Sequence, residues 1–339
     1  MGNLKSFKYQ IPLLIFILTI SLVGLSLIFL NFSDKNTAMI RVAYHPDLHG
    51  AGIMVLAEEK GYFKNEGLRV EMIKFLSGPP EIQALTSGDI DIGYLGPGAH
   101  FYAANGQCKV LAIDSLNLGD ALIAHKNRGI LKVKDLQGKR VGVPKGTSGE
   151  MILNLALDKA QIGLEQVNIQ YMDVAGAVAA FVAGKIDAVS LWTPYITEIK
   201  KRVGADELII LADNNSFSPD YVFLQSWVAS DRFLKDHPDL AVKFMRAWIK
   251  ANDYRLFHMD ETVQLTSKFT QIPEDSLRVM VEQTQWFDSK TIKKYFDDGT
   301  AAKWYENQEK MFVKIGKQKK VINPSRFLAP EAFLQAFSD

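Results

Sequence analysis

The sequence predicts an α/β protein with two similar lobes, each built on a parallel or mixed sheet flanked by helices. The main observation is a pattern that occurs twice. One copy begins at Gly67 and ends with Gly88-Asp89-Ile90-Asp91, and the other begins at Gly163 and ends with Gly184-Lys185-Ile186-Asp187. Because the glycines and aspartates of the two copies stand at equal separations, one supersecondary unit is repeated.

Each copy has the pattern of a strand, a helix and a second strand. Residues 70–75 and 167–171 are rich in β-forming side chains that alternate with polar ones. Ile82 and Leu85 then follow at helical spacing, and Gly88 stands where the end of a helix requires a positive φ. Two strands joined by one helix pair in parallel, and open parallel sheets bind ligands beyond the carboxyl ends of their strands. We therefore expect the ligand in the cleft between the lobes.

The positions of the other strand patterns divide the chain between the lobes. Lobe one is predicted to contain residues 39–123 and 226–339, and lobe two residues 124–225. The chain then crosses between the lobes near Ile123 and near Leu224. Because only two covalent links join the lobes, they can close over a ligand by a hinge motion.

The N-terminal residues 1–38 are predicted to form a membrane segment and a linker. Residues 11–32 carry no charge and, at about 1.5 Å per residue, span about 33 Å as a helix, which is enough to cross a bilayer. Lys5 and Lys8 precede this stretch, so the amino end should stay in the cytoplasm and the remainder should face outward. A cleaved signal peptide is the alternative, but the apolar run is longer than is usual for one.

Composition excludes several classes of function. The 339 residues suffice for two domains, each with a hydrophobic core. The net charge of +1 does not indicate the basic surface that nucleic-acid-binding proteins carry. Cys108 is the only cysteine and has no evident base beside it, so we expect no catalytic residue and no cofactor. His45 and His49 are four residues apart, but Pro46 indicates a loop between them, so we expect no metal site.

Five short motifs carry a resemblance to a known family. They are Gly61-Tyr62-Phe63 before Glu66-Gly67-Leu68, Phe75-Leu76-Ser77-Gly78, Gly88-Asp89-Ile90-Asp91, Asp135-Leu136-Gln137-Gly138, and Leu191-Trp192-Thr193-Pro194-Tyr195. In this order they resemble the substrate-binding proteins of ABC importers in the nitrate, taurine and aliphatic-sulfonate group. The resemblance covers roughly residues 40–200, and the carboxyl third is similar only in its helical character.

This resemblance implies a type II periplasmic-binding fold, a bilobed clamp that delivers a small solute to a membrane permease and its ATPase. It implies a monomer that lies outside the cytoplasm, either held at the membrane by its N-terminal helix or periplasmic. The superfamily also contains binders of thiamin-precursor pyrimidines and other heterocycles, so the family alone does not identify the ligand.

Lobe two contains the best candidate for an anion site. Gly146-Thr147-Ser148-Gly149 lies between a predicted strand and a predicted helix, where backbone N–H groups and hydroxyls point from the helix start into the cleft. The stretch is not a P-loop, because the order is Lys145-Gly146-Thr147 and the preceding glycine spacing differs. An ordinary capping turn is the alternative.

The matching positions of lobe one are Ser77-Gly78 and Gly96-Pro97, both supported by the resemblance. Pro79 and Pro80 follow Gly78 and remove two N–H donors from the start of that helix. A sulfonate would therefore depend on Thr147-Ser148, whereas a planar ligand tolerates the prolines more easily.

Aromatic and acidic residues at predicted strand ends complete the candidate site. Trp192 ends the strand whose counterpart in lobe one ends at Gly96. Asp47, Asp120 and Asp220 are each able to pair with a ligand amine, or to serve as ordinary turn residues. The predicted ligand-binding residues are His45, Ser77, Gly78, Gly96, Pro97, Asp120, Thr147, Ser148, Gly149, Trp192 and Tyr221.

These observations favour an extracytoplasmic receptor that binds a small organic anion of the aliphatic sulfonate, taurine or nitrate type. One alternative is a receptor for a heterocyclic vitamin precursor, such as a thiamin-type pyrimidine or a flavin. Another is an enzyme built on the same fold.

Overall fold

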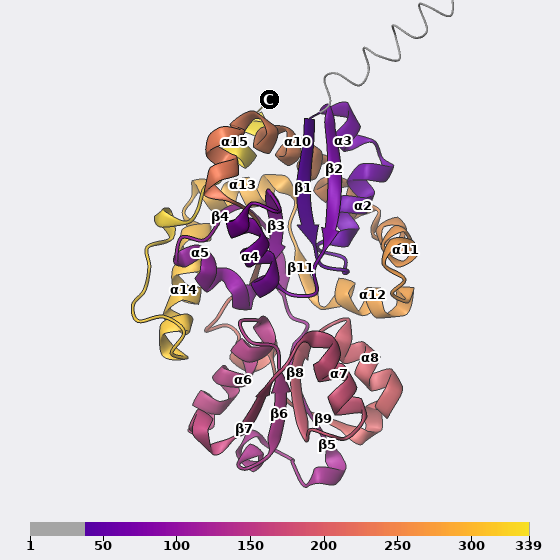
Figure 1. Ribbon diagram of the computed structural model, residues 1–339, viewed down its shortest axis with the longest axis vertical. Coiled ribbons are helices and arrows are strands. Elements are labelled where there is room, and N and C mark those ends of the chain that lie inside the picture. The colour runs from indigo at the N-terminus through magenta and orange to yellow at the C-terminus, as the bar shows by residue number, and fades with distance from the viewer. Residues whose placement is uncertain (1–37, 339) are drawn as a thin grey trace, which may run out of the picture.

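The structure, a computed structural model, describes residues 38–338 of the chain. Two lobes stand one above the other in Figure 1. Lobe one contains the first part of the described chain and its end, and lobe two contains the middle. The predicted membrane segment, residues 11–32, lies outside the described residues. Among residues 38–338, no helix is long and apolar enough to cross a membrane.

Lobe one has a six-stranded mixed sheet in the order β11-β4-β10-β3-β1-β2. Strands β1, β2 and β3 are parallel, whereas β10 runs antiparallel to both β3 and β4, and β11 is antiparallel to β4. The strands are β1 (Ala38–Tyr44), β2 (Leu68–Lys74), β3 (Ile92–Leu95), β4 (Lys109–Asn117), β10 (Leu224–Ala229) and β11 (Thr284–Trp286).

Helices cover this sheet, and the largest side chains of its core, Trp227, Phe244 and Trp248, are at most 1% exposed. The helices are α2 (Ala51–Glu59), α3 (Tyr62–Asn65), α4 (Gly78–Ser87), α5 (His100–Ala104), α9 (Asp231–Asp236), α10 (Pro238–Phe257), α11 (Met259–Thr270), α12 (Glu274–Glu282), α13 (Ser289–Asp297), α14 (Thr300–Lys314) and α15 (Glu331–Ser338).

Lobe two has a five-stranded sheet in the order β7-β6-β8-β5-β9. Its strands are β5 (Asp120–His125), β6 (Arg140–Val143), β7 (Asn168–Tyr171), β8 (Ala188–Trp192) and β9 (Leu208–Asp213). Its helices are α6 (Ser148–Lys159), α7 (Val174–Val182) and α8 (Tyr195–Val203). Leu122 and Ile123, neighbours on β5, belong to different buried clusters, so both faces of this sheet are covered.

The sequence repeat has a common structural cause in the two lobes. Asp91 accepts hydrogen bonds from the backbone N (2.8 Å) and the guanidinium Nη2 (2.9 Å) of Arg41, at the beginning of the lobe. Asp187 accepts the same pair of bonds from Arg140, at 2.9 and 3.0 Å. The repeated aspartate therefore fixes β1 in lobe one and β6 in lobe two through charge-assisted hydrogen bonds.

The crossings between the lobes differ in part from the prediction. All of β5 lies in the sheet of lobe two, where Ile123 pairs with Val189, so the chain crosses first at Leu118–Gly119 rather than near Ile123. Two short β patterns follow each other here, and neither pattern indicates which sheet it joins. Residues 218–223 form the return crossing into β10, close to the predicted position at Leu224.

Helix α14 is a third, non-covalent connection between the lobes. Met311 and Phe312 belong to the same buried cluster as Ile152 of α6, in lobe two. The Phe312 ring also packs edge to face against Phe101 of lobe one, with ring centres 5.8 Å apart. In addition, Lys314 Nζ lies 2.9 Å from the Asp158 carboxylate of α6. The hinge therefore has two covalent crossings and one helix packed against both lobes.

Replacing Phe312 with alanine should lower the free energy of unfolding by about 3 to 5 kcal/mol, because a fully buried aromatic ring leaves a cavity behind. Phe257 is 84% exposed at the end of α10, so Phe257→Ala is the matched control and should change that free energy by less than about 0.5 kcal/mol. Urea denaturation measures both values. Equal effects of the two substitutions would contradict the packing of α14 between the lobes.

Candidate ligand-binding site

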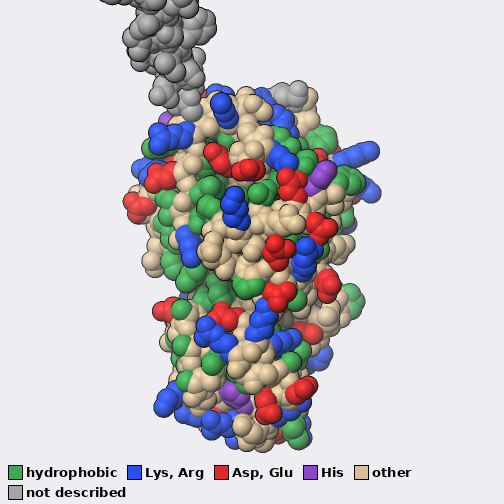
Figure 2. Space-filling model, turned by 90° about the vertical axis from the view of Figure 1, so that its right-hand side faces the viewer, with side chains coloured by type: hydrophobic (Ala, Val, Ile, Leu, Met, Phe, Trp, Pro, Cys, Tyr) green, Lys and Arg blue, Asp and Glu red, His purple; other side chains and the backbone are tan. Residues whose placement is uncertain are grey.

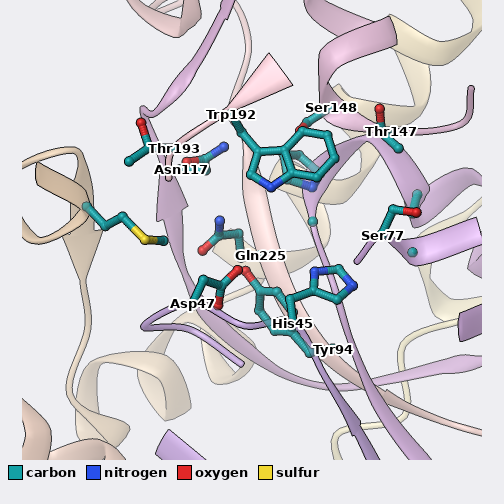
Figure 3. Close-up of a pocket in the computed structure, with 15 residues that line it drawn as sticks. His45, Asp47, Ser77, Tyr94, Asn117, Thr147, Ser148, Trp192, Thr193 and Gln225 are labelled. Carbon is teal, nitrogen blue, oxygen red and sulfur yellow. The ribbon is translucent and has the colours of Figure 1, made fainter. Parts of the chain in front are cut away.

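A small cavity lies in the cleft between the lobes, at the carboxyl ends of strands from both sheets. Its volume is about 30 Å³, and we call it the cleft cavity. Ten of its residues are labelled in Figure 3, where the Trp192 ring lies across from His45 and Tyr94. The lining residues are His45, Asp47, Ser77, Gly78, Tyr94, Gly96, Pro97, Ala99, Asn117, Thr147, Ser148, Trp192, Thr193, Gln225 and Met280.

Lobe two contributes the beginning of α6. Its N-cap residue is Thr147, whose hydroxyl donates a hydrogen bond to Pro144 O (2.7 Å) and so fixes the turn. The first hydrogen bond within the helix runs from Met151 N to Thr147 O, so the N–H groups of residues 148–150 have no partner inside it. These groups and the helix dipole give the cavity a positive partial charge from this side.

Lobe one contributes the beginning of α4. Ser77 is the N-cap residue, and its side chain makes no capping hydrogen bond. Gly78 packs closely, because a Cβ there would lie 2.8 Å from the Cβ of Ala99. Pro79 and Pro80 occupy the first turn, as the sequence analysis expects, so this helix offers fewer N–H donors than α6. Two helix starts of unequal donor strength therefore meet across the cavity.

A buried pair of titratable groups lies on the lobe one side. His45 Nε2 is 3.0 Å from Glu81 Oε2, and both side chains are at most 8% exposed. Burial alone lowers the pKa of His45, but the negative charges of Glu81 and Asp47 outweigh burial and raise that pKa. Burial raises the pKa of Glu81, against the opposing effect of His45. Each group therefore favours the charged form of the other, at a place that burial makes unfavourable for both charges.

Glycine is required beneath this pair. The backbone N of Tyr94 donates to Glu81 Oε1, which lies against the strand β3. A Cβ on Gly93 would lie 2.1 Å from that oxygen, so a side chain there would displace the carboxylate. Glycine at position 93 therefore leaves room for the Glu81 carboxylate that contacts His45.

A second buried network fixes the loop that carries His45 and Asp47. Arg255 of α10 donates to Asp114 (3.0 Å) and to Leu48 O (3.2 Å), and His49 Nδ1 lies 2.9 Å from Asp114. Burial alone would raise the pKa of Asp114, but Arg255 and His49 lower it to about 2. His45 and His49 thus have different carboxylate partners. Among residues 38–338, no three His, Cys, Asp or Glu side chains are grouped as a metal site.

Three predicted residues lie outside the lining of the cleft cavity. Asp120 is buried at the hinge, where Asn117 (2.6 Å) and Asn214 (2.9 Å) donate to its carboxylate, and burial raises its pKa to about 6. Gly149 packs on β8, where a Cβ would lie 2.4 Å from Ser190 O. Tyr221 packs against the hydrophobic cluster around α6. The other eight predicted residues line the cavity.

Several lining residues were not among those predicted from the sequence. Asn117 and Gln225 are polar side chains at or near the ends of buried strands. A polar residue at the end of an apolar strand pattern is visible in the sequence and would have indicated both as site residues. Ser115 Oγ donates to Gln225 Oε1 (2.8 Å), and Thr193 Oγ1 donates to Gln283 Oε1 (2.7 Å) across the lobes. Met280 comes from α12, in a helical region whose sequence carries no motif.

Few charged side chains line the cleft cavity. Asp47 is its one carboxylate, and no lysine or arginine occurs among the lining residues that the structure describes. Positive potential therefore comes from backbone N–H groups at the helix starts. Cys108 is 1% exposed in the core of lobe one, and burial raises the pKa of its thiol, so it is placed away from the cleft as an unreactive thiol.

The lobes are closed on each other in this structure. A Cβ on Gly98 would lie 2.0 Å from the carbonyl carbon of Thr147, so the two backbones touch across the cleft. Lys201 of α8 also bonds to Asp275 of α12 at 2.7 Å. The cavity of about 30 Å³ is small beside the roughly 150 Å³ that holds a benzene ring. A ligand of several non-hydrogen atoms therefore enters only when the lobes separate.

Comparison with known proteins gives the same assignment from sequence and from fold. A putative binding protein of Brucella abortus is 36% identical over 295 residues, covering 87% of this chain and 91% of that protein. A putative aliphatic sulfonates-binding protein of Bacillus subtilis is 29% identical and covers 68% of this chain and 70% of its own length. These relatives confirm the resemblance to sulfonate-binding proteins that the sequence motifs indicate.

Two solved structures show the fold. The alkanesulfonate-binding protein SsuA of Xanthomonas axonopodis pv. citri, bound to MOPS, superposes with a TM-score of 0.67 at 19% identity and covers 87% of this chain and 99% of that one. The desulfurization enzyme DszB has a TM-score of 0.63 at 16% identity, covering 88% and 99%. The predicted periplasmic-binding fold is thereby confirmed.

The family described as NMT1/THI5 like is matched by residues 50–262, which include the whole sheet of lobe two, strands β2, β3, β4 and β10 of lobe one, and most of the cleft lining. The chain therefore belongs to the NMT1/THI5-like family.

Proposed function

We propose that the protein is an extracytoplasmic solute-binding receptor of an ABC importer, which captures a small organic anion by closure of its two lobes. The observation that carries this proposal is the meeting of two helix starts, α4 at Ser77 and α6 at Thr147-Ser148, on one cavity between hinged lobes. The binding-protein relatives support a transport role. The partners are then a permease and its ATPase, and the receptor acts as a monomer.

Among anions, a sulfonate fits this arrangement best. Its three oxygens each accept hydrogen bonds, the first turn of α6 presents the N–H groups of residues 148–150, and Ser148 lines the cavity. Asp47 lines the same cavity and would pair with the ammonium group of a zwitterion such as taurine. The name of the Bacillus subtilis relative supports the same ligand class. Nitrate, which is planar and smaller, belongs to the same proposal as a weaker candidate.

A heterocyclic ligand is the second candidate, and one observation favours it. The Trp192 side chain lines the cavity and its ring lies over it in Figure 3, which suits stacking on a planar ring. An enzyme on this fold is less well supported. Nucleophilic catalysis by the only cysteine requires an accessible thiolate, whereas Cys108 is buried in the core of lobe one.

The proposed location outside the cytoplasm rests on the sequence and on the family. Residues 11–32 form an uncharged stretch preceded by Lys5 and Lys8, which favours an amino end in the cytoplasm and a receptor facing outward. Retention of this stretch as an anchor, rather than its removal as a signal peptide, is part of the proposal.

A thermal-shift panel tests the ligand class. It compares alkanesulfonates, taurine, nitrate, thiamin-type pyrimidines and flavins on the full chain. A true ligand at about 100 times its Kd should add roughly 2.7 kcal/mol to the free energy of unfolding, which is readily detected. We expect stabilisation by a sulfonate. Stabilisation by a heterocycle alone would replace the first candidate by the second.

Ser148→Ala tests the start of α6. Loss of a hydrogen bond to a charged ligand should weaken sulfonate binding by about 1 to 3 kcal/mol. Ser87→Ala, at the exposed far end of α4, is the matched control and should leave the Kd unchanged. Isothermal titration calorimetry measures both. An unaltered Kd in Ser148→Ala would remove this hydroxyl from the site.

Trp192→Ala separates the two candidate ligand classes. A stacked ring should lose about 0.5 to 1.5 kcal/mol more than an aliphatic anion does, because stacking adds to the loss of buried area. The control is Trp304→Ala, which lies on α14 away from the cavity. If binding survives Trp192→Ala unchanged for every ligand in the panel, the indole does not contact the ligand.

A further inference from the structure

A second and larger pocket lies between the lobes, beside the cleft cavity. Its volume is about 480 Å³, and we call it the side pocket. In Figure 1 the helices that line it, α8 of lobe two and α11 and α12 of lobe one, lie on the same side of the molecule. Its lining residues are Pro46, Lys74, Leu76, Pro194, Tyr195, Glu198, Lys201, Arg202, Thr270, Gln271, Ile272, Pro273 and Ser276.

The two spaces are separated by a single layer of residues. Pro46 lines the side pocket, and its neighbours in the chain on both sides line the cleft cavity. Likewise, Leu76 lines the side pocket and its neighbour Ser77 lines the cleft cavity. On α12, Ser276 faces the side pocket and Met280, one turn later, faces the cleft cavity. Segments of lobe one thus pass from one space to the other within one residue or one helical turn.

On the lobe two side, the layer between the two spaces consists of two aromatic rings. Trp192 lines the cleft cavity and Tyr195 lines the side pocket, and their rings meet edge to face with centres 5.6 Å apart. Tyr195 lines the side pocket together with Pro46 and Leu76 of lobe one, on the other side of the cleft. Because the layer is built from both lobes, it divides along the cleft when the lobes separate.

The lining of the side pocket suits an apolar group. Leu76, Tyr195 and Ile272 line it together with three prolines. Most of its charged side chains are already paired, since Lys201 bonds to Asp275 (2.7 Å) and Arg202 to Glu198 (2.8 Å). The remaining charged residue, Lys74, is exposed at the end of β2. A ligand group in this pocket therefore needs no charge of its own.

The nearby surface gives no reason to expect a charged macromolecule here. Figure 2 looks onto the side of the molecule where α8 and α12 lie, and acidic and basic side chains are mixed over both lobes on it. A groove for a polyanion or a polycation would show one sign of charge. The pocket itself is of the size and character of a small-molecule site.

We propose that the side pocket holds the apolar tail of the ligand, whose anionic head lies in the cleft cavity at the start of α6. This inference rests on the proposed function and narrows its ligand class. The cleft cavity, at about 30 Å³, is too small to take a tail as well as a head group, whereas the side pocket has more than the roughly 150 Å³ that holds a benzene ring. The ligand is then an organic anion with a tail longer than the two-carbon chain of taurine.

Calorimetric titration of the full chain with methanesulfonate, butanesulfonate and hexanesulfonate tests this inference. The three ligands share one head group and differ only in the length of the tail. Each methylene buried in the side pocket should tighten binding about fourfold. Leu76→Asp places a carboxylate in the pocket and should abolish this gain with chain length, and Ile272→Asp should do the same.

The matched control is Leu131→Asp, at a leucine that is 69% exposed in lobe two and outside the side pocket. It should leave the dependence on chain length intact. Equal affinity for all three ligands, or an unaltered dependence in both pocket variants, would overturn the tail site and leave the anion receptor standing. Failure of all three sulfonates to bind would overturn the tail site and the sulfonate receptor together.

Discussion

The geometry of the cleft depends on the absence of a side chain at Gly98. The backbone of lobe one touches the start of α6 there, and a Cβ would lie 2.0 Å from the carbonyl carbon of Thr147. This contact brings the start of α6 to the cavity that Ser77 also lines, so two helix starts from different lobes meet at one cavity. Because the contact is between backbones, larger side chains at this position would hold the lobes apart and leave each helix start facing water.

The sequence contained most of the information needed for the scaffold. The repeat ending in Asp91 and Asp187 predicted two lobes, and the structure shows why both aspartates are present: through an arginine, Asp91 fixes β1 and Asp187 fixes β6. Thr147, Ser148 and Trp192 were predicted as site residues because strand ends and helix starts are visible in local patterns. The structure places all three around one cavity.

What the sequence could not provide depends on contacts between distant segments. Arg255 lies on a helix with no motif, yet its guanidinium fixes the loop of His45 through Asp114 and Leu48. Met280 reaches the cavity from α12 for the same kind of reason. Asp120 looks like a ligand partner by position, but Asn117 and Asn214 hold it at the hinge. The positions of these residues depend on contacts between segments that are far apart in the sequence, and local sequence patterns do not reveal such contacts.

The position of β10 in its sheet determines which of the two sheets is completed first during synthesis of the chain. β10 lies between β3 and β4, but it is made only after the whole of lobe two. A chain synthesised from its amino end therefore finishes the sheet of lobe two first, while β3 keeps one unpaired edge and β4 has no partner strand. Such edges are where nascent chains associate wrongly. Strands β3 and β4 are thus synthesised before lobe two, but they gain the strand that lies between them only after it.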